Sequence, residues 1–223
     1  MTEPLSGTRE RILAAAAEIF GARGYSGATT RQIAAAAGVN VAAINYHFEG
    51  KLGLYTEVLE SLLSKGFARY PADMGLAPGA PAAQRLEAFV RSFCHRLLGP
   101  EGWGGYHGKA RLIIKEMADP SPALADVVAR HIQPHKQMLV EIVQELLGPG
   151  VATRAAVACA FSIVGQCIYY ATAEPLLSLL APERKDIEAR IEELAEHVIV
   201  FSLGGIEKTI ESLSATGRAE EEP

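Results

Sequence analysis

Three glycines, Gly24, Gly38 and Gly50, constrain the fold most strongly, because they divide the first 55 residues into helical segments. Before Gly24, a segment that begins near Thr8 repeats apolar residues at i, i+3, i+4 and i+7, which places them on one face of a helix. Gly38 supplies the positive φ angle that a tight turn between two helices usually needs. The pattern therefore predicts three packed N-terminal helices joined by sharp turns.

The two short segments on either side of Gly38 have the features of a helix-turn-helix. Three polar residues are candidate N-caps: Thr29 and Thr30 for the first helix, and Asn40 for the second, which is expected at Val41–Phe48. Four small or apolar residues are expected to lie between the helices and let them cross closely: Ala34, Ala35, Val39 and Ile44.

The second helix of this pair presents a short, uncharged surface with many hydrogen-bonding groups, which suits insertion into the major groove of DNA. The residues predicted to face the bases are Asn40, Val41, Ala42, Asn45, Tyr46 and His47. The residues predicted to hold phosphates are Thr29, Thr30, Arg31 and Lys51. Charge adds little, because residues 1–55 carry five basic and four acidic side chains in a chain of net charge −5.

Composition fits an ordinary folded protein rather than a disordered one, with 49% hydrophobic and 21% charged residues. No β-strand alternation is found, so the predicted fold class is all-α, with a linker at Pro71–Pro81 and a helix kinked at Pro134. Three cysteines and no signal peptide indicate the cytoplasm. The apolar segment Ala155–Ala171 is predicted to be a buried or interface helix rather than a membrane span.

Residues Thr8–Tyr55 resemble the N-terminal domain of TetR-family transcriptional regulators. The family positions that recur in order are Ile12, Ala15, Phe20, Gly24, Thr30, Ile33, Ala34, Ala37, Gly38, Val39, His47, Phe48, Lys51 and Leu54. One departure is Asn45, where the family usually has Tyr. An asparagine at this position could reach a base edge or a phosphate, so the resemblance leaves the operator open.

Two further stretches, Lys115–Leu124 and Ala160–Tyr170, resemble the C-terminal domain of the CecR-type branch. The resemblance implies an all-helical homodimer that binds a palindromic double-stranded DNA operator, most often as a repressor. It also implies release of the operator when a small-molecule effector binds. The expected organisation is a helix-turn-helix domain at residues 1–55, a helical effector-binding and dimerisation domain at residues 56–216, and a disordered tail at residues 217–223.

The last two helical segments are expected to form the dimer interface. Ala155–Ala171 is apolar on nearly every side, and Gly165 lets another backbone approach. The segment from about Pro182 to Leu213 carries an apolar stripe wider than one core contact needs: Ile187, Ile191, Leu194, Val198, Ile199, Val200, Phe201, Leu203, Ile206 and Ile210. A fully buried helix in a monomer is the alternative.

No motif locates the effector pocket. The candidates are aromatic, sulfur and histidine side chains of the middle helices: Phe89, Phe93, Trp103, Tyr106, His107, Met117, Met138, Phe161 and Tyr169. Each of them, taken singly, also suits an ordinary core. An apolar pocket with few polar groups would favour a hydrophobic or aromatic effector.

Other arrangements do not support catalysis, a metal site or a cofactor. His131 and His135 share a helical face but lack the glutamate of an HExxH site, so surface or interface histidines are expected. Gly102–Lys109 does not have the spacing of a phosphate loop. Cys159 and Cys167, about 12 Å apart along one helix, are interpreted as small hydrophobes, with a redox sensor as the alternative.

The chain is therefore not expected to be an enzyme. Two other function classes remain open at this point. One is a helical ligand-binding scaffold without DNA binding, against which a steep salt dependence of duplex binding would argue. The other is an α-helical enzyme, for which turnover would have to appear without a recognisable catalytic set.

Overall fold

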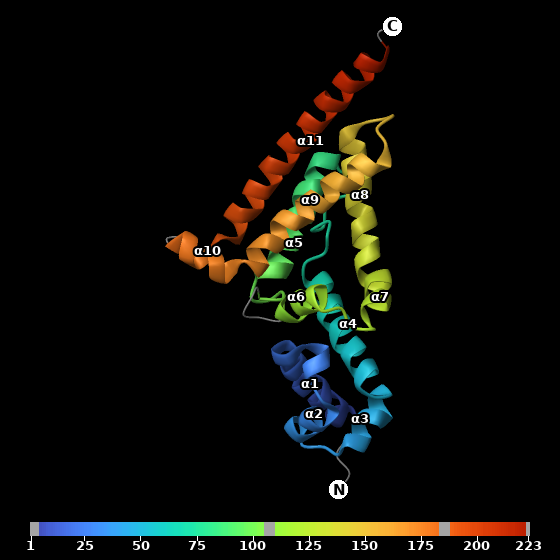
Figure 1. Ribbon diagram of the computed structural model, residues 1–223, viewed down its shortest axis with the longest axis vertical. Helices are drawn as coiled ribbons and strands as arrows, with labels where there is room; N and C mark the ends of the chain where they lie inside the picture. Colours follow the sequence, from blue (N-terminus) through green and yellow to red (C-terminus); the bar gives the residue numbers. More distant parts are fainter. Residues whose placement is uncertain (1–4, 105–109, 183–187, 222–223) are drawn as a thin grey trace.

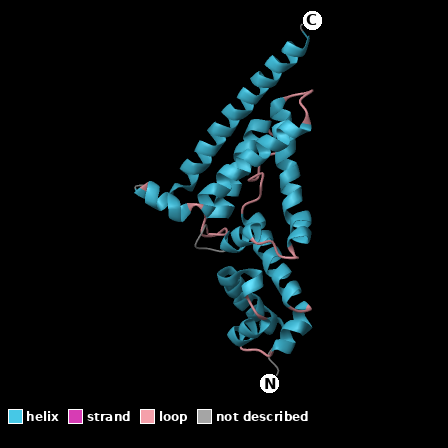
Figure 2. Cartoon of the chain, in the orientation of Figure 1, coloured by secondary structure: helices cyan, strands magenta, loops and turns pink. Residues whose placement is uncertain are grey.

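The computed structural model describes residues 5–104, 110–182 and 188–221 of the chain, and every regular element within them is helical (Figures 1 and 2). The all-α prediction is confirmed. A small lobe holds the N-terminal helices, a larger lobe holds the C-terminal helices, and helix α4 runs from one into the other (Figure 1).

The small lobe contains α1 (Leu5–Gly27), α2 (Thr30–Ala37) and α3 (Val41–Phe48). Helix α3 has the predicted bounds, and α2 begins after Thr29, one of its two candidate caps. Helix α1 begins before Thr8. As predicted, the helical geometry stops at Gly24, which has φ 69°, and a kinked continuation of three residues follows.

Helix α4 (Lys51–Arg69) is the connecting element. Its apolar side is buried along its whole length, at Leu54, Tyr55, Val58, Leu59, Leu62 and Leu63. The first half packs on α1 and α3, and the second half packs on α5 and α7 of the large lobe. A single continuous helix therefore contributes to the cores of both lobes.

The large lobe is built on α5 (Ala82–Leu98), α8 (Gln133–Leu147), α9 (Thr153–Thr172) and α11 (Ile191–Glu221), which pack on one another. Shorter elements surround them: α6 (Ala110–Ala118), α7 (Leu124–Val127), the π-helical turn η1 (Val128–Ile132), α10 (Glu174–Leu180) and the 3₁₀ turn η3 (Glu188–Arg190). Helix α11 is the long diagonal helix at the C-terminal end in Figure 1.

The predicted kink at Pro134 takes the form of a change of helix type. The π-turn η1 runs directly into α8, and Pro134, which has no backbone N–H group to donate, lies in the first turn of α8. The predicted linker at residues 71–81 is confirmed as a stretch of loops and turns between α4 and α5.

Two expectations for the C-terminal part differ from the structure. Helix α10 was not predicted, because its seven residues are too few to show a helical period. Helix α11 continues to Glu221, into the residues expected to form a disordered tail. The segment after Gly217 contains alanine and glutamate, which favour helix, so a charged composition alone does not end α11.

Trp103 fixes the second half of α4 to the loop that follows α5. Its indole Nε1–H donates a hydrogen bond to the carbonyl oxygen of Leu62, at 3.0 Å. The ring lies directly on Gly66, where a Cβ atom would be 2.7 Å from Cε2 of Trp103. Gly66 is therefore required by a close approach between an indole ring and a helix backbone.

Replacement of Gly66 by alanine is expected to lower the free energy of unfolding by about 1–3 kcal/mol, because the added methyl group overlaps the indole ring. Gly21→Ala in α1 is the matched control, since nothing lies within 4 Å of its Cβ position. The control is expected to be neutral or to stabilise by up to about 1 kcal/mol through helix propensity. Urea unfolding of both variants measures the difference, and equal effects would contradict this account of Gly66.

Candidate nucleic-acid interface

Helix α2 begins with a capping box. The Thr29 side chain accepts a hydrogen bond from the backbone N–H of Gln32 at 3.2 Å, and the Gln32 side chain accepts one from the backbone N–H of Thr29 at 3.0 Å. Gly38 ends the helix at φ 66°, as predicted from the turn. The cap thus fixes where α2 begins, and Thr30 and Arg31 are its first two residues. Arg31 is exposed.

Helix α3 is capped by Asn40, whose Oδ1 accepts a hydrogen bond from the backbone N–H of Ala42 at 3.0 Å. Ile44 is completely buried against the core, as expected. Ala34 is buried too, whereas Ala35 is exposed, so the prediction that both alanines lie between the helices is wrong for Ala35. On α2, position 35 falls on the solvent side of the helix.

The predicted DNA-facing residues do not all share one face of α3, because Val41 and His47 flank its buried side. Asn40, Ala42, Asn45 and Tyr46 are exposed, whereas Val41 and His47 are partly buried. Tyr46 is 76% exposed, and its ring packs only on His47, with 5.0 Å between ring centroids. This large, exposed side chain on α3 is available for an intermolecular contact.

The predicted phosphate contacts lie at two helix starts: Thr29, Thr30 and Arg31 at the start of α2, and Lys51 at the first residue of α4. The Lys51 ammonium sits 4.3 Å from the centre of the Tyr25 ring, which restrains the long side chain. The backbone N–H groups at the starts of α2 and α4, together with these side chains, are of the kind that bind phosphate oxygens.

Two residues at the α3–α4 junction were missed by the sequence analysis. Glu49 ends α3 in the left-handed region, at φ 57°. Gly53 lies in α4 so close to α3 that a Cβ atom would overlap the carbonyl oxygen of Phe48. A glycine inside a helical pattern gives little signal in sequence, because the need for it comes from the neighbouring helix.

Helix α6 of the large lobe contacts both α1 and α4. Glu116 is 3% exposed and accepts three hydrogen bonds, from the Tyr55 hydroxyl (2.5 Å), the Ser121 backbone N–H (2.9 Å) and the Ser121 hydroxyl (2.6 Å). Burial, and then the hydrogen bond to Glu116, raise the pKa of Tyr55 well above that of a free tyrosine. The neighbouring Lys115 donates a hydrogen bond to the Ala22 carbonyl of α1.

The effector candidates do not gather in one cavity. Trp103 and Phe89 are buried, and Phe93 is partly buried, in the core of the large lobe. Four others are largely exposed: Met117, Met138, Phe161 and Tyr169. Tyr106 and His107 lie outside the described residues. The candidates were chosen by residue type, which does not indicate the helix face on which each side chain lies.

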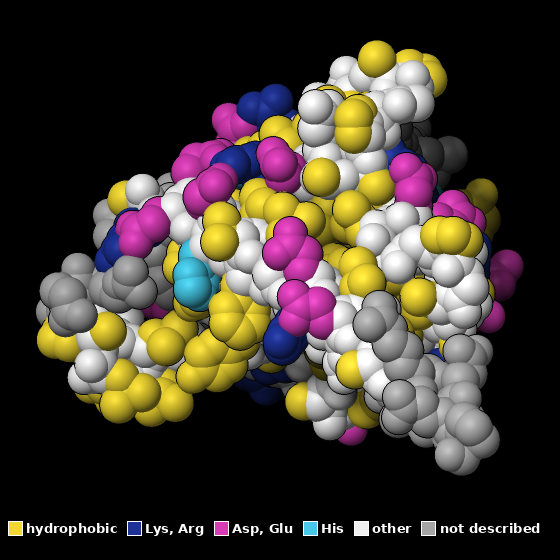
Figure 3. All heavy atoms as spheres, turned by 90° about the horizontal axis from the view of Figure 1, so that it is seen from above, with side chains coloured by type: hydrophobic (Ala, Val, Ile, Leu, Met, Phe, Trp, Pro, Cys, Tyr) yellow, Lys and Arg dark blue, Asp and Glu magenta, His cyan; other side chains and the backbone are white. Residues whose placement is uncertain are grey.

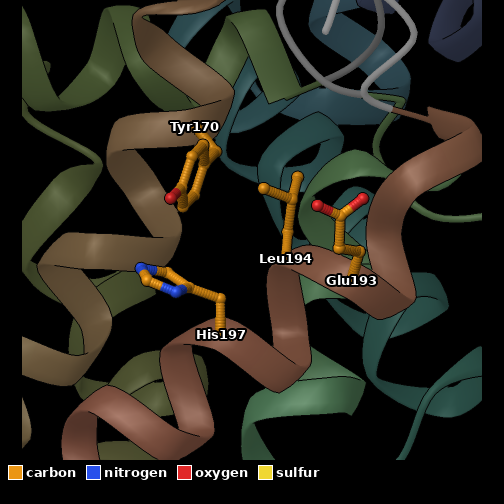
Figure 4. Close-up of a pocket in the computed structure, with 4 residues that line it drawn as sticks. All are labelled: Tyr170, Glu193, Leu194 and His197. Carbon is orange, nitrogen blue, oxygen red and sulfur yellow. The ribbon is translucent and has the colours of Figure 1, made fainter.

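A cavity of about 340 Å³ lies between α9 and α11 (Figure 4). It is lined by Tyr170 from α9 and by Glu193, Leu194 and His197 from α11. The rings of Tyr170 and His197 face the same space in Figure 4. None of these four residues was among the effector candidates, and Leu194 was expected in the dimer interface.

Cys167 and His135 each make a close contact inside the large lobe. Cys167 faces Cys94 of α5, with 3.8 Å between the sulfur atoms, rather than Cys159. His135 stacks on Phe67, with 3.8 Å between ring centroids, and its Nδ1 lies 2.9 Å from the His131 carbonyl oxygen. Within the described residues, no group of three or more His, Cys, Asp or Glu side chains could hold a metal ion.

Two family models match the chain and together cover most of it. The model of the bacterial regulatory proteins of the tetR family matches residues 12–58. The model of the C-terminal domain of the HTH-type transcriptional dual regulator CecR matches residues 82–206, more than half of the chain. The chain belongs to the TetR family of transcriptional regulators and has a CecR-type C-terminal domain.

Individual relatives agree with this family. The probable HTH-type transcriptional regulator YttP of Bacillus subtilis is 25% identical over 138 residues, 62% of this chain and 64% of YttP. The HTH-type transcriptional repressor KstR2 of Rhodococcus jostii is 35% identical over 89 residues, 40% of this chain and 43% of KstR2. The aligned part thus spans less than two thirds of either relative.

Among solved structures, FadR of Bacillus subtilis in complex with stearoyl-CoA has the same fold as this TetR-family chain. The TM-score is 0.61 at 18% sequence identity, and the match covers 85% of this chain and 97% of FadR. At this identity the likeness establishes the fold.

Tyr55→Phe is expected to destabilise this TetR-family protein by about 1–3 kcal/mol at pH 8, because Glu116 keeps only the two hydrogen bonds from Ser121. The pKa of Tyr55 is raised by folding, so its contribution is complete below the ordinary tyrosine pKa of about 10 and falls at higher pH. The difference between wild type and variant should therefore shrink between about pH 8 and pH 10.5.

Urea unfolding at the two pH values measures this difference. Tyr25→Phe serves as the control, because Tyr25 packs on Tyr55 at a centroid distance of 5.0 Å but is not a partner of Glu116. A loss of stability in Tyr55→Phe that does not change with pH would contradict the role assigned to the hydroxyl.

Proposed function

We propose that the protein is a ligand-responsive transcriptional repressor that binds a palindromic DNA operator as a homodimer. The observation that carries the proposal is the capped α2–α3 pair, which presents the exposed face of α3 at the free end of the small lobe (Figure 1). The tetR-family match over the same residues supports DNA binding, and the repressor KstR2 among the relatives supports repression.

In this proposal α3 lies in the major groove. Its contacts to bases come from Asn40, Val41, Ala42, Asn45, Tyr46 and His47, and the phosphate contacts come from Thr29, Thr30, Arg31 and Lys51. Asn40 has a second role as helix cap, which occupies its Oδ1 and leaves its amide N–H groups as donors. The small excess of positive charge in residues 1–55 then suffices for DNA binding, because the positive ends of the α2 and α4 helix dipoles also attract phosphate groups.

The unpaired apolar surface of α9 and α11 supports a homodimer. Phe161, Tyr169, Val200 and Phe201 are 48–63% exposed, and hydrophobic side chains are visible at the surface in the view from above (Figure 3). Helix α9 is also long and apolar enough to cross a membrane by length and composition alone, with 28% of its apolar window buried. A second copy packed on α9 and α11 accounts for this exposure without a membrane, which fits a cytoplasmic protein.

The remaining residues, 56–216, take the roles of effector binding and dimerisation in this proposal. The apolar core of these residues favours a small hydrophobic or aromatic effector. The complex of FadR with stearoyl-CoA supports an apolar ligand for a protein of this fold. We propose no catalytic activity, since the relatives are transcriptional regulators.

Selection of bound duplexes from a random DNA pool at near-physiological salt tests the proposal, and an enriched palindrome is the expected result. On that operator, Tyr46→Ala is expected to lower affinity about tenfold or more and to relax base preference. Lys51→Ala should weaken binding to all duplexes alike and reduce the salt dependence by about one charge.

Lys65→Ala is the control for Lys51→Ala, because Lys65 is an exposed lysine of the same helix outside the proposed interface. No enrichment by a well-folded dimer would favour the ligand-binding scaffold instead. Unchanged affinity in both Tyr46→Ala and Lys51→Ala would contradict the assignment of this face.

Replacement of either Phe161 or Phe201 by glutamate is expected to dissociate the dimer, because a carboxylate would be buried without a partner in the interface. Size-exclusion chromatography with light scattering measures the mass, and operator affinity should fall with the loss of the second recognition helix. Met117→Glu is the control, since Met117 is 56% exposed on α6, away from α9 and α11. A dimer that survives both phenylalanine replacements would place the interface elsewhere.

A further inference from the structure

Arg96 of α5 is a buried cation without a counterion. Its side chain is completely buried, and it is the largest such side chain among the described residues. Its Nη1 donates a hydrogen bond to the Tyr70 carbonyl oxygen at 3.0 Å, while Nε has no partner. No carboxylate of the described residues forms an ion pair with it. A guanidinium group has five N–H donors, so most of its hydrogen-bonding capacity is unused.

The surroundings of Arg96 are aromatic. The guanidinium carbon lies 4.8 Å from the centre of the Phe67 ring and 5.6 Å from that of Phe93. Trp103 packs edge-on against Phe67, and its backbone N–H donates to the Arg96 carbonyl oxygen at 2.6 Å. The rings attract the cation but cannot neutralise it. Burial lowers the pKa of Arg96 to about 10, so the side chain remains charged at pH 7.

The charge and the surroundings together define a ligand class. One positive charge is matched by a singly charged anion, and a planar carboxylate accepts two parallel hydrogen bonds from a guanidinium group. His135, stacked on Phe67, adds no second charge, because burial lowers its pKa. The aromatic side chains on either side favour an apolar body attached to the anion.

We infer that Arg96 binds the carboxylate group of the effector, and that the effector is a carboxylic acid with an apolar aliphatic or aromatic body. This inference rests on the proposed effector response and names the chemistry of that ligand. The site differs from the cavity between α9 and α11, which Arg96 does not line.

Arg96 also connects such a ligand to α4. Tyr70 is the C-cap of α4, and its carbonyl oxygen accepts hydrogen bonds from both Arg96 and the Ser92 hydroxyl, each at 3.0 Å. A carboxylate that binds the unused donors of the guanidinium neutralises its charge and so weakens its attraction for this carbonyl group. Ligand binding therefore weakens the tie between α5 and the end of α4, the helix whose other end begins at Lys51 beside α3.

Calorimetric titration of the full-length protein with octanoate, dodecanoate and cinnamate, each paired with its methyl ester and kept below micelle-forming concentrations, tests the inference. At least one acid is expected to bind wild type about tenfold or more tightly than its ester. Arg96→Met, which removes the charge and keeps an apolar side chain, should weaken binding of that acid about 10- to 100-fold and leave ester binding unchanged.

Arg91→Met is the matched control on the same helix, because Arg91 is partly exposed and pairs with Glu192 and Glu196. It should leave acid binding unchanged. If Arg96→Met does not fold, Arg96→Lys replaces it. Lysine keeps the charge without the bidentate geometry, so it should retain a preference for the acid over the ester at reduced affinity.

Three results would overturn the inference: no acid preferred over its ester by wild type, undiminished acid binding by a folded Arg96→Met, or acid binding lost in His197→Ala but kept in Arg96→Met. The last result would place the acid in the cavity between α9 and α11. Operator affinity is measured on the same samples without ligand. Absence of specific DNA binding there would contradict the proposed function, whereas the acid–ester comparison would still decide the role of Arg96.

Discussion

The structure depends on one shared helix, α4, whose apolar side is part of the core of both lobes. Its first residue, Lys51, lies beside the Tyr25 ring and next to α3, and its last turn is tied to α5 through the carbonyl oxygen of Tyr70. A packed helix is stiff along its axis, so a displacement at one end is carried to the other rather than absorbed between them. Any signal from the large lobe to the small lobe has this helix as its most direct route.

Helix α6 supplies a second connection, at the middle of α4. It belongs to the large lobe, yet Lys115 bonds to the backbone of α1 and Glu116 bonds to Tyr55. The Tyr55 ring in turn packs on Phe20 and Tyr25, so the carboxylate and the aromatic side chains of the small lobe form one contiguous network. Allosteric coupling energies are typically about 1–3 kcal/mol, which is comparable to the value of one buried hydrogen bond to a charged group. The network is therefore strong enough to influence how the small lobe is held.

The sequence predicted what depends on neighbours along the chain and missed what depends on neighbours in space. The caps at Thr29 and Asn40 and the turn at Gly38 are local, and the helix-turn-helix was found from them, with correct bounds for α3. Gly53 and Gly66 are needed only because another segment lies against them. The described effector candidates do not line one cavity, and the reason is again spatial. An aromatic residue on a helix with an irregular apolar pattern can face either the core or the solvent. The burial of Glu116 and Arg96 gave no sequence signal, since charged residues are normally exposed.

The buried charges of Glu116 and Arg96 differ in how completely the protein satisfies them. This difference distinguishes a structural role for Glu116 from the ligand-binding role inferred for Arg96. Removing a charged group from water costs several kcal/mol unless its hydrogen-bonding groups find partners. Glu116 finds three donors, so its burial is offset within the protein, and its bond to Tyr55 holds α6 to α4. Arg96 finds one acceptor and two aromatic rings, so part of the cost remains in the free protein. An anion that completes the pairing relieves that cost, and its binding free energy is then linked to the contact that Arg96 makes with the end of α4.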